Sequence, residues 1–284
     1  RYLKMLDNKS GSSLLSRLVL TFDFLLERHV IRRADAVVAV SDEVKRYHAL
    51  ARNAIEKFVL IPCGIDPSEI VSSGTLRVQY RSQLGIDEDE TTIGFVGRLS
   101  AEKNPATLLR ACSGLLSKPL PGLRCRLLLV GGGPLEGQLL QLAQALRIRD
   151  RVIFLGVRHD VPAILNSLDI FVSSSIDEGS PLSLLEAMAA GCAVLGSDIP
   201  SIREVVRDGE TGLLFSPCDA EDLDRHLVTL CTSPHLRVSL GRKAREFVLS
   251  YHNIDQIYSK ITELYASVRK PRSDVHVRAQ HHGV

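Results

Sequence analysis

The sequence contains no tryptophan, and aromatic residues make up only 5% of its 284 residues. Its formal net charge is a mild +2. Proteins that bind single-stranded nucleic acid combine basic grooves with aromatic stacking platforms, so we expect no nucleic-acid partner. There is also no signal peptide and no apolar run long enough to cross a bilayer. We therefore expect a cytoplasmic protein, with peripheral association at the inner face of the membrane left open.

Cysteine is sparse, with six residues scattered along the chain and no C-x-x-C pair. Several of them stand inside apolar runs. This pattern predicts buried, reduced thiols rather than a zinc site or a disulfide framework. The chain begins with Arg1 instead of Met, so we also expect a fragment of a longer protein.

Short apolar runs alternate with helical segments beyond about residue 90, and hydrophobic residues make up 45% of the chain. Continuous apolar strands joined by helices through short loops predict an α/β protein with a Rossmann-like, doubly wound parallel sheet of about six strands. The expected strands are Thr92–Gly97, Arg126–Gly131, Val152–Gly156, Asp169–Ser173, Ala193–Ser197 and Gly212–Phe215. The expected helices between them are Asn104–Leu116, Leu135–Leu146, Val161–Asn166, Leu182–Ala190 and Ile202–Arg207.

The N-terminal part has fewer elements. An amphipathic helix is expected over Ser12–Arg33, packed on a sheet rather than lying on a membrane surface, and strands over Ala36–Val40 and Lys57–Ile61. Turn residues after Ile61 predict a linker between domains, which separates residues 1–61 from a second domain at residues 62–253. Helices are expected over Glu221–Leu230, His235–Ser250 and Asp255–Val268. Residues 270–284 are expected to form a flexible tail.

Polar residues follow several of the expected strands, where ligands of such sheets bind. Arg98 and Lys103 follow the first strand, and Lys103 opposes the dipole of the next helix, which favours a function over a solvated surface. Three glycines, Gly131 to Gly133, follow the second strand; alone, they indicate only a tight turn. Asp160 is expected to cap the helix that follows the third strand. Glu204, after the fifth strand, is equally well explained as a surface acid.

The segment from Asp177 to Glu186 joins the fourth strand to a helix. Pro181 suits the first helical turn, and the backbone amides after it form a seat for phosphate. Glu178 and Glu186 are both compatible with plain surface acids. Glu186, however, stands among apolar residues, where an idle carboxylate is costly to bury, and carboxylates bind sugar and ribose hydroxyls well. The segment therefore suggests a nucleotide with a polyol attached.

Together these motifs resemble the retaining nucleotide-sugar glycosyltransferases of family four, which have the two-domain GT-B fold. The matching text is G-R-L-S-A-E-K-N-P from Gly97, L-L-V-G-G-G-P from Leu128, R-V-I-F-L-G from Arg151, E-G-S-P-L-S-L-L-E-A-M-A from Glu178, then S-D-I-P-S-I-R-E-V-V and D-G-E-T-G-L-L-F. The E-x7-E spacing of Glu178 and Glu186 is the hallmark of the family. The resemblance covers roughly residues 34 to 268.

The resemblance implies roles for individual residues. Arg98 and Lys103 would hold the donor diphosphate, Glu178 would face the donor sugar as a third catalytic residue, Glu186 would bind the ribose, and Val157 would contact the base. The donor site implied in this way comprises Gly97, Gly132, Val157, Glu178, Gly179, Ser180, Pro181, Leu182, Ser183 and Glu186. No obvious D-x-D metal pair is noted in the chain, so we expect no metal and no cofactor. The co-substrate would be a UDP-, GDP- or ADP-linked sugar, and the acceptor a glycan or lipid-linked molecule.

Three departures from the family pattern limit these expectations. Only the last part of the acceptor-side domain has a counterpart, as a remnant at residues 1–61, and the usual P-N-G-I-D linker reads Pro62-Cys63-Gly64-Ile65-Asp66. The resemblance implies that the last helix, at residues 254–269, crosses back to that domain, where its docking surface is incomplete. The leading expectation is a retaining, metal-independent glycosyltransferase. The alternative is a truncated or partner-dependent nucleotide-sugar-binding module without activity of its own. A phosphorylase on the same fold is a weaker rival, which free phosphate as acceptor would reveal.

Overall fold

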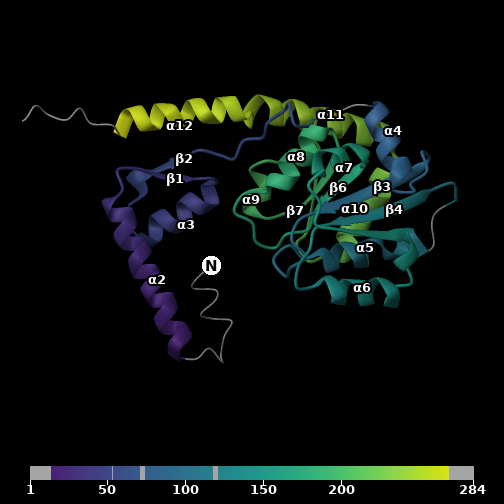
Figure 1. The fold of residues 1–284 in the computed structure, drawn as a ribbon, viewed down its shortest axis with the longest axis horizontal. Coiled ribbons are helices and arrows are strands. Elements are labelled where there is room, and N and C mark those ends of the chain that lie inside the picture. The colour runs from purple at the N-terminus through teal and green to yellow at the C-terminus, as the bar shows by residue number, and fades with distance from the viewer. Residues whose placement is uncertain (1–13, 53, 71–73, 118–120, 269–284) are drawn as a thin grey trace, which may run out of the picture.

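The fold was analysed in a computed structural model that describes residues 14–52, 54–70, 74–117 and 121–268 (Figure 1). The tail expected at residues 270–284, and the first residues of the helix expected from Ser12, lie outside these ranges. Within the described ranges the chain forms two separate sheets, one of two strands and one of six. None of the described helices combines the length and apolar character needed to cross a membrane.

The smaller sheet pairs β1 (Val37–Ala39) with β2 (Phe58–Leu60) in parallel. Its helices are α2 (Leu14–Arg33) and α3 (Asp42–Arg52), and the 3-10 turn η1 (Ile55–Lys57) precedes β2. A small core of Ile31, Ala39, Ala54 and Phe58 holds these elements together. We call residues 14–61 the small unit. Its two short strands agree with the strands expected in the N-terminal part.

The larger sheet confirms the expected doubly wound architecture. Its six strands are all parallel and run in the spatial order β5-β4-β3-β6-β7-β8. The strands are β3 (Glu90–Val96), β4 (Arg124–Val130), β5 (Val152–Gly156), β6 (Ile170–Ser173), β7 (Ala193–Ser197) and β8 (Leu213–Phe215). The first strand of this sheet, β3, therefore lies in its middle. The next two strands extend the sheet to the edge at β5, and β6 then pairs with the other side of β3. The reversal of strand order lies between β3 and β6.

Helices cover both faces of this sheet, as Figure 1 shows with α5 and α6 on one side and α4, α7 and α8 on the other. They are α4 (Gly74–Gln83), α5 (Pro105–Ser117), α6 (Glu136–Ala145), α7 (Val161–Ser167), α8 (Leu182–Ala190), α9 (Pro200–Arg203), α10 (Ala220–Thr232) and α11 (Pro234–Tyr251), with a 3-10 turn η2 (Arg149–Arg151) before β5. We call residues 74–251 the large unit.

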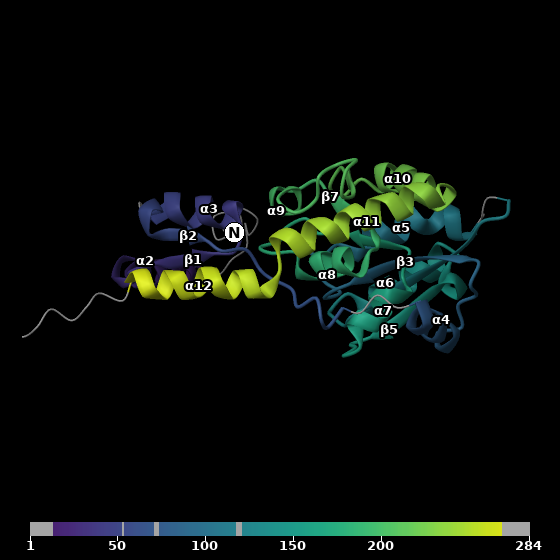
Figure 2. The same cartoon turned by 90° about the horizontal axis from the view of Figure 1, so that it is seen from above.

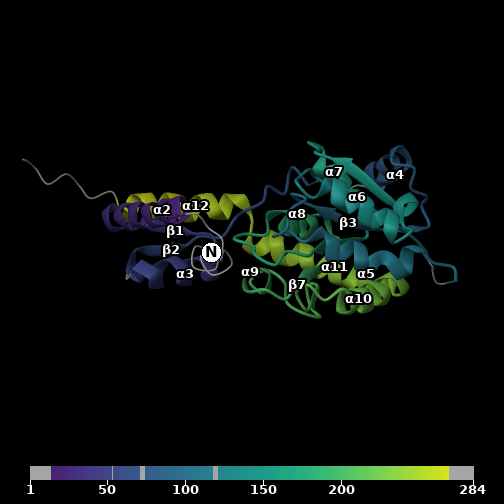
Figure 3. The same cartoon turned by 90° about the horizontal axis from the view of Figure 1, so that it is seen from below.

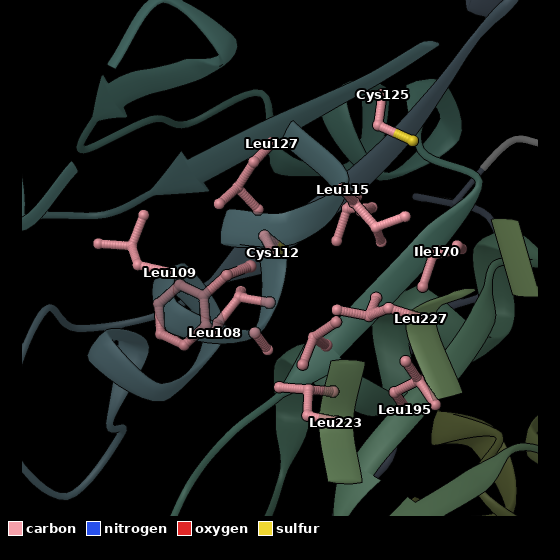
Figure 4. Close-up of a cluster of buried hydrophobic side chains, with 14 of the residues drawn as sticks. Leu108, Leu109, Cys112, Leu115, Cys125, Leu127, Ile170, Leu195, Leu223 and Leu227 are labelled. Atoms are coloured by element: carbon pink, nitrogen blue, oxygen red, sulfur yellow. The ribbon is translucent and has the colours of Figure 1, made fainter. Parts of the chain in front are cut away.

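Two hydrophobic cores follow from the alternation of side chains along each strand. In β4, Leu127 and Leu129 point into the core shared with α5 and α10, which Figure 4 shows around Leu108, Cys112 and Leu227. Leu128 and Val130 of the same strand point into the opposite core, against α7, α8 and α11. Because both faces are buried, the strands read as continuous apolar runs, which explains why their positions could be predicted.

The structure corrects several expectations. Helix α4 was not expected; its Arg77 and Arg81 bind the carboxylate of Asp169, at 2.7 and 3.4 Å, and so anchor a polar segment that has little apolar pattern of its own. Helix α9 is Pro200–Arg203 rather than Ile202–Arg207. Asp160 stands at the N-cap of α7 but does not cap it, because its carboxylate binds Arg158 and the hydroxyl of Tyr80 instead.

The expected burial of the six thiols holds only in part. All six are free, but Cys218 is exposed and Cys63 is half-buried. Burial raises the pKa of the Cys192 thiol to about 12. The four buried cysteines therefore act as small core residues.

The linker between the units is bound to the junction of α11 and the last helix, α12 (Ile254–Val268). The amide of Ile65 donates to the carbonyl of His252 at 2.8 Å, and the amide of Ile254 donates to the carbonyl of Ile65 at 3.0 Å. His252 is buried, and its Nδ1 donates to the carbonyl of Cys63 at 3.0 Å. Burial lowers the pKa of this imidazole, which favours the neutral ring. From this junction α12 runs alongside the small unit in all views (Figures 1 to 3).

Candidate functional site

The candidate site lies at the carboxyl ends of β3 and β6, where the strand order reverses. These strands are direct parallel neighbours, with Ile93 opposite Ile170 and Gly94 opposite Phe171. The loops that follow them, residues 97–104 and 174–181, therefore emerge side by side. In open α/β sheets this is the position where ligands bind.

Lys103 and Glu178 face each other across these loops. The Lys103 ammonium and the Glu178 carboxylate form an ion pair, with 25% and 11% of the respective side chains exposed. The hydroxyl of Ser175 is 3.4 Å from the same carboxylate. Two residues that the sequence only suggested separately thus form one polar centre. In a complex, an anionic ligand could bind the Lys103 ammonium, and ligand hydroxyl groups could donate hydrogen bonds to the Glu178 carboxylate.

Backbone and side-chain hydrogen bonds join the two loops below this ion pair. The amide of Ile176 donates to the carbonyl of Glu102 at 2.8 Å, and the hydroxyl of Ser174 donates to the carbonyl of Lys103 at 2.9 Å. The hydroxyl of Ser197, at the end of β7, also donates to the carbonyl of Ser175. These serines were not predicted as site residues, although the run Ser173–Ser175 at a strand end was a visible signal.

Asn104, the residue after Lys103, has a left-handed backbone with φ +47°. Its side-chain amide donates to Thr107 Oγ1 at 2.8 Å, which lies in the first turn of α5. This local bond suits the tolerance of asparagine for the left-handed region. The conformation turns the chain between Lys103 and α5.

The glycine-rich turn after β4 packs against the loop that carries Arg98. A Cβ atom at Gly131 would lie 2.0 Å from the carbonyl oxygen of Gly97, and one at Gly133 would lie 2.4 Å from that of Leu99. The amide of Leu99 donates to the carbonyl of Gly132 at 3.0 Å. The glycines are therefore required for this close backbone approach, and they shape the Arg98 loop from below.

Arg98 itself is exposed, and its guanidinium makes no hydrogen bond or ion pair with any residue that the structure describes. A surface guanidinium without a partner is available to an anionic ligand. Val157 follows β5 and is 74% exposed, and its Cγ2 would touch a Cβ placed on Gly132 at 3.1 Å. Gly132 and Val157 are thus neighbours at the side of the site that lies over β4 and β5.

Helix α8 begins at the site, with Pro181 at its N-cap. Gly179 is exposed, and a Cβ on it would meet nothing within 4 Å, so this turn is open to a ligand. The amide of Leu182 donates to the carbonyl of Ser180 at 3.0 Å, which means that a phosphate bound to this amide would replace that bond. Ser183 is half-buried in the first turn of the helix, close to the positive end of its dipole.

Glu186 lies one turn further into α8 and is half-buried. Burial raises the pKa of its carboxyl group, and the nearby carboxylate of Glu69 raises it further. Its carboxylate has no hydrogen bond or ion pair within the described ranges. Glu69 belongs to the segment after the linker and was not predicted near the site. A half-buried acid without a partner matches the expectation that Glu186 serves a ligand.

The expectation that the chain has no D-x-D pair is wrong, because two such pairs occur away from this centre. Asp87 and Asp89 have the D-x-D spacing, but both bind Arg124, at 2.5 and 3.2 Å, beside the opposite end of β3. Asp222 and Asp224 have it as well, on α10, where Asp222 accepts the amide of Ser216 at 2.7 Å. Among the described residues no group of three or more His, Cys, Asp or Glu side chains has the arrangement of a metal site.

The sequence profile of the family "Glycosyl transferases group 1" matches residues 77–247 of this chain. A D-inositol 3-phosphate glycosyltransferase of Rhodococcus erythropolis (strain PR4 / NBRC 100887) is 32% identical over 236 residues, which are 77% of this chain and 50% of that protein. An N-acetyl-alpha-D-glucosaminyl L-malate synthase of Bacillus anthracis is 30% identical over 190 residues, 67% of this chain and 49% of that protein. The chain thus spans about half the length of the curated relatives it matches.

Solved structures show the same fold. The crystal structure of Anabaena Alr3699/HepE in complex with UDP-glucose superimposes with a TM-score of 0.80 at 22% identity, over 87% of this chain and 68% of that one. Sucrose-phosphate synthase from Thermosynechococcus elongatus gives a TM-score of 0.75 at 27% identity, over 86% and 61% of the two chains. The expected GT-B architecture of the large sheet is therefore confirmed.

Proposed function

The chain belongs to the glycosyl transferases group 1 family, and on this basis we propose that it is the donor-binding part of a glycosyltransferase. The donor would be a nucleotide-diphosphate sugar, with a UDP-linked sugar the first choice because solved structures of this fold contain UDP and UDP-glucose. The observation that carries the proposal is the Lys103–Glu178 pair, placed beside the N-terminus of α8 at the strand-order reversal. It combines a cation for phosphate with a carboxylate for hydroxyl groups.

Each predicted residue has a place in this proposal. Arg98, Lys103 and the first amides of α8 would bind the diphosphate, and Glu178 with the Gly179–Ser180 backbone would bind the sugar. Glu186 would accept hydrogen bonds from the ribose hydroxyls, and Val157 would lie against the base. The raised pKa of Glu186 supports a ligand role. Burial destabilises its ionised carboxylate, and hydrogen bonds donated by ribose hydroxyls would stabilise that carboxylate.

The proposed reaction breaks the bond between the anomeric carbon and the β-phosphate oxygen and forms a bond from that carbon to an acceptor hydroxyl oxygen. The acceptor proton passes to the departing phosphate oxygen, and the configuration at the anomeric carbon is retained. Negative charge that develops on the diphosphate would be stabilised by Arg98, Lys103 and the helix dipole. These groups could serve without a metal ion, so we propose a metal-independent transfer.

Calorimetry with UDP-, GDP- and ADP-sugars tests the donor assignment on the purified chain. We expect heat of binding with a UDP-sugar and a clear loss of affinity in Glu186→Ala. Arg110→Ala is a suitable control, because Arg110 is an exposed cation on α5 away from the loops. Absence of binding for every nucleotide sugar would exclude the proposed donor site.

A second candidate function follows from the share of the relatives that the chain covers. Because it spans about half their length, the chain could bind the donor and leave transfer to a larger assembly. Release of UDP from UDP-glucose in the presence of sugar acceptors separates the two. Binding without release would favour the nucleotide-sugar-binding module, and binding with release the transferase.

A further inference from the structure

Glu204 connects the large unit to the first turn of a helix in the small unit. It forms the C-cap of α9, and its carboxylate accepts hydrogen bonds from two backbone amides of α3. The amide of Asp42 donates to Oε2 at 3.0 Å, and that of Glu43 donates to Oε1 at 3.1 Å. The bonded residues are 162 and 161 positions apart in the sequence. In Figures 1 to 3, α9 lies on the side of the large unit that faces the small unit.

The contact satisfies groups that the helix cannot satisfy by itself. The first amides of an α-helix have no intrahelical acceptor, and they carry the positive end of its dipole. The amide of Val44 donates a hydrogen bond to the Ser41 hydroxyl at 3.2 Å, and the amide of Lys45 donates one to the Ser41 carbonyl at 3.0 Å. Ser41 therefore caps the later amides, and Glu204 supplies both acceptors for the first two.

The side chain of Asp42 does not compete for this position, because its carboxylate pairs with Arg46 one turn further along α3. The capping of α3 is thus divided between its own residue and a residue of the other unit. Loss of the contact would leave two amides of α3 to water, so the contact favours the observed arrangement of the units.

The contact also borders the donor site. Glu204 lines a cavity of about 460 Å³ between the units, together with Ser41 of the small unit and with Ser180 and Pro181 of the turn before α8. The linker junction at Ile65 and His252 is a separate attachment, close to the point where the chain passes between the units. One attachment near a linker allows rotation about it, whereas a second attachment away from it restricts that rotation.

We propose that Glu204 is a positioning residue that holds the small unit in a defined orientation over the donor loop at Ser180 and Pro181. The consequence for sugar transfer rests on the proposed function, because it concerns how the acceptor side faces the donor. The orientation itself does not depend on that function. No contact between Glu204 and the donor is required.

Spin-label distance measurements test the orientation directly. Labels at Val38→Cys and Val238→Cys would report on the two units, since these side chains are 47% and 72% exposed. Cys63→Ser and Cys218→Ser remove the accessible native thiols from this background. We expect one narrow distance distribution for the parent and a broader or shifted one for Glu204→Ala. In the same variant the amide resonances of Asp42 and Glu43 should move.

Glu210→Ala is the matched control, because Glu210 is an exposed acid on the same segment that pairs with Arg207. It should leave both the distances and the amide resonances unchanged. Glu204→Gln should lie between the parent and the alanine variant, because its amide oxygen can still accept a hydrogen bond. Parent-like distances and unmoved amide resonances in Glu204→Ala would overturn the proposal.

Binding and turnover separate this proposal from the proposed function. Calorimetry with UDP-glucose should show an affinity for Glu204→Ala within about twofold of the parent, because the donor groups stay in place, while turnover should fall about tenfold through lost orientation. Equal binding and equal turnover in parent and variant would contradict the positioning role. If no variant binds any nucleotide sugar, the donor assignment fails, and the distance measurements still decide the role of Glu204.

Discussion

The Lys103 ammonium forms an ion pair with the Glu178 carboxylate, although the two residues are 75 positions apart in the sequence. Lys103 follows β3 and Glu178 follows β6, so the pair exists because these strands are neighbours in the sheet. Both side chains are mostly buried, which strengthens their interaction relative to a fully solvated pair. The pair is the polar centre of the proposed donor site, and its two members are expected to have different ligands.

Replacement of Lys103 by alanine should reduce turnover more than donor binding. The cation would act mainly on the charge that develops as the diphosphate departs, so its loss should lower kcat by about 100- to 1,000-fold. The KM for UDP-glucose should change by only about threefold, because Arg98 and the α8 amides remain. UDP release measured over a range of donor concentrations gives both constants. A rise in KM with an unchanged kcat would contradict this role of Lys103.

Replacement of Glu186 by glutamine should stabilise the protein while it weakens donor binding. Burial raises the pKa of Glu186 in the folded state, so at neutral pH the folded protein holds an unfavourable charge. This cost is fully present above the folded-state pKa and absent below the ordinary glutamate pKa of 4.5. The Tm of Glu186→Gln should therefore exceed that of the parent by about 2 °C at pH 7.5.

The pH dependence supplies the check on that prediction. The difference in Tm should shrink as the pH falls through the raised pKa of Glu186, and the contribution of its charge should be lost below the ordinary value of 4.5. Glu88→Gln is a control, since Glu88 is an exposed glutamate before β3. A Tm difference that is the same at both pH values would show that the charge of Glu186 is not its cause.

Replacement of Gly131 by alanine should disrupt the Arg98 loop. The new Cβ would lie 2.0 Å from the Gly97 carbonyl oxygen, and the backbone at Gly131 has φ +125°. We expect a loss of about 2–4 kcal/mol in the free energy of unfolding, together with weaker UDP-sugar binding. Denaturant unfolding and calorimetry measure the two effects.

Gly137→Ala provides the matched comparison for Gly131→Ala. Gly137 lies in α6, and a Cβ there would meet nothing within 4 Å. Alanine at this helical position should stabilise the protein by about 0.5–1 kcal/mol. Similar losses of stability in both variants would mean that close packing is not what requires glycine at Gly131.

Replacement of Glu90 by glutamine should destabilise the sheet without altering the donor site. The Glu90 side chain is fully buried, and its Oε1 lies 2.9 Å from Arg126 and 3.4 Å from Arg151. Removal of this charge leaves partly buried arginines without a counter-ion, which should cost about 3–5 kcal/mol. Glu90 starts β3, at the end of the strand away from Lys103, so affinity for UDP-glucose below the unfolding transition should not change. Chemical unfolding and calorimetry test the two statements.

The large sheet was the most predictable part of the fold. The bounds expected for β5, β7 and α8 agree with the structure, because each is an apolar run that glycine or a polar turn interrupts. Helix α4 could not be predicted in the same way. Its position depends on contacts of Arg77 and Arg81 with Asp169, which lies 92 and 88 residues further along the sequence.

The candidate site was predictable as a set of residue types but not as a set of contacts. Glycine and proline at the turn before α8, and the spacing of Glu178 and Glu186, are visible in the sequence and indicate a polyol phosphate ligand. Two contacts are not visible in the sequence: the hydroxyl of Ser175 near the Glu178 carboxylate, and the carboxylate of Glu69 near Glu186. Neither pair belongs to a regular helix or strand pattern that would place its two residues together. Glu204 is the clearest case. Its sequence context allowed a surface acid, and only the arrangement of α3 and α9 shows what its carboxylate binds.

The sequence by itself determined where the strands of the large unit lie, where its helices other than α4 and α9 lie, and which chemical groups follow each strand. It could do so because burial on both faces of a parallel sheet demands continuous apolar runs, and the polar residues between them stand out. The tertiary structure alone decided which of those groups meet. The strand order places Lys103 next to Glu178, and the arrangement of the two units places Glu204 next to the first amides of α3. Such contacts depend on the three-dimensional path of the chain between distant residues, which no local pattern encodes.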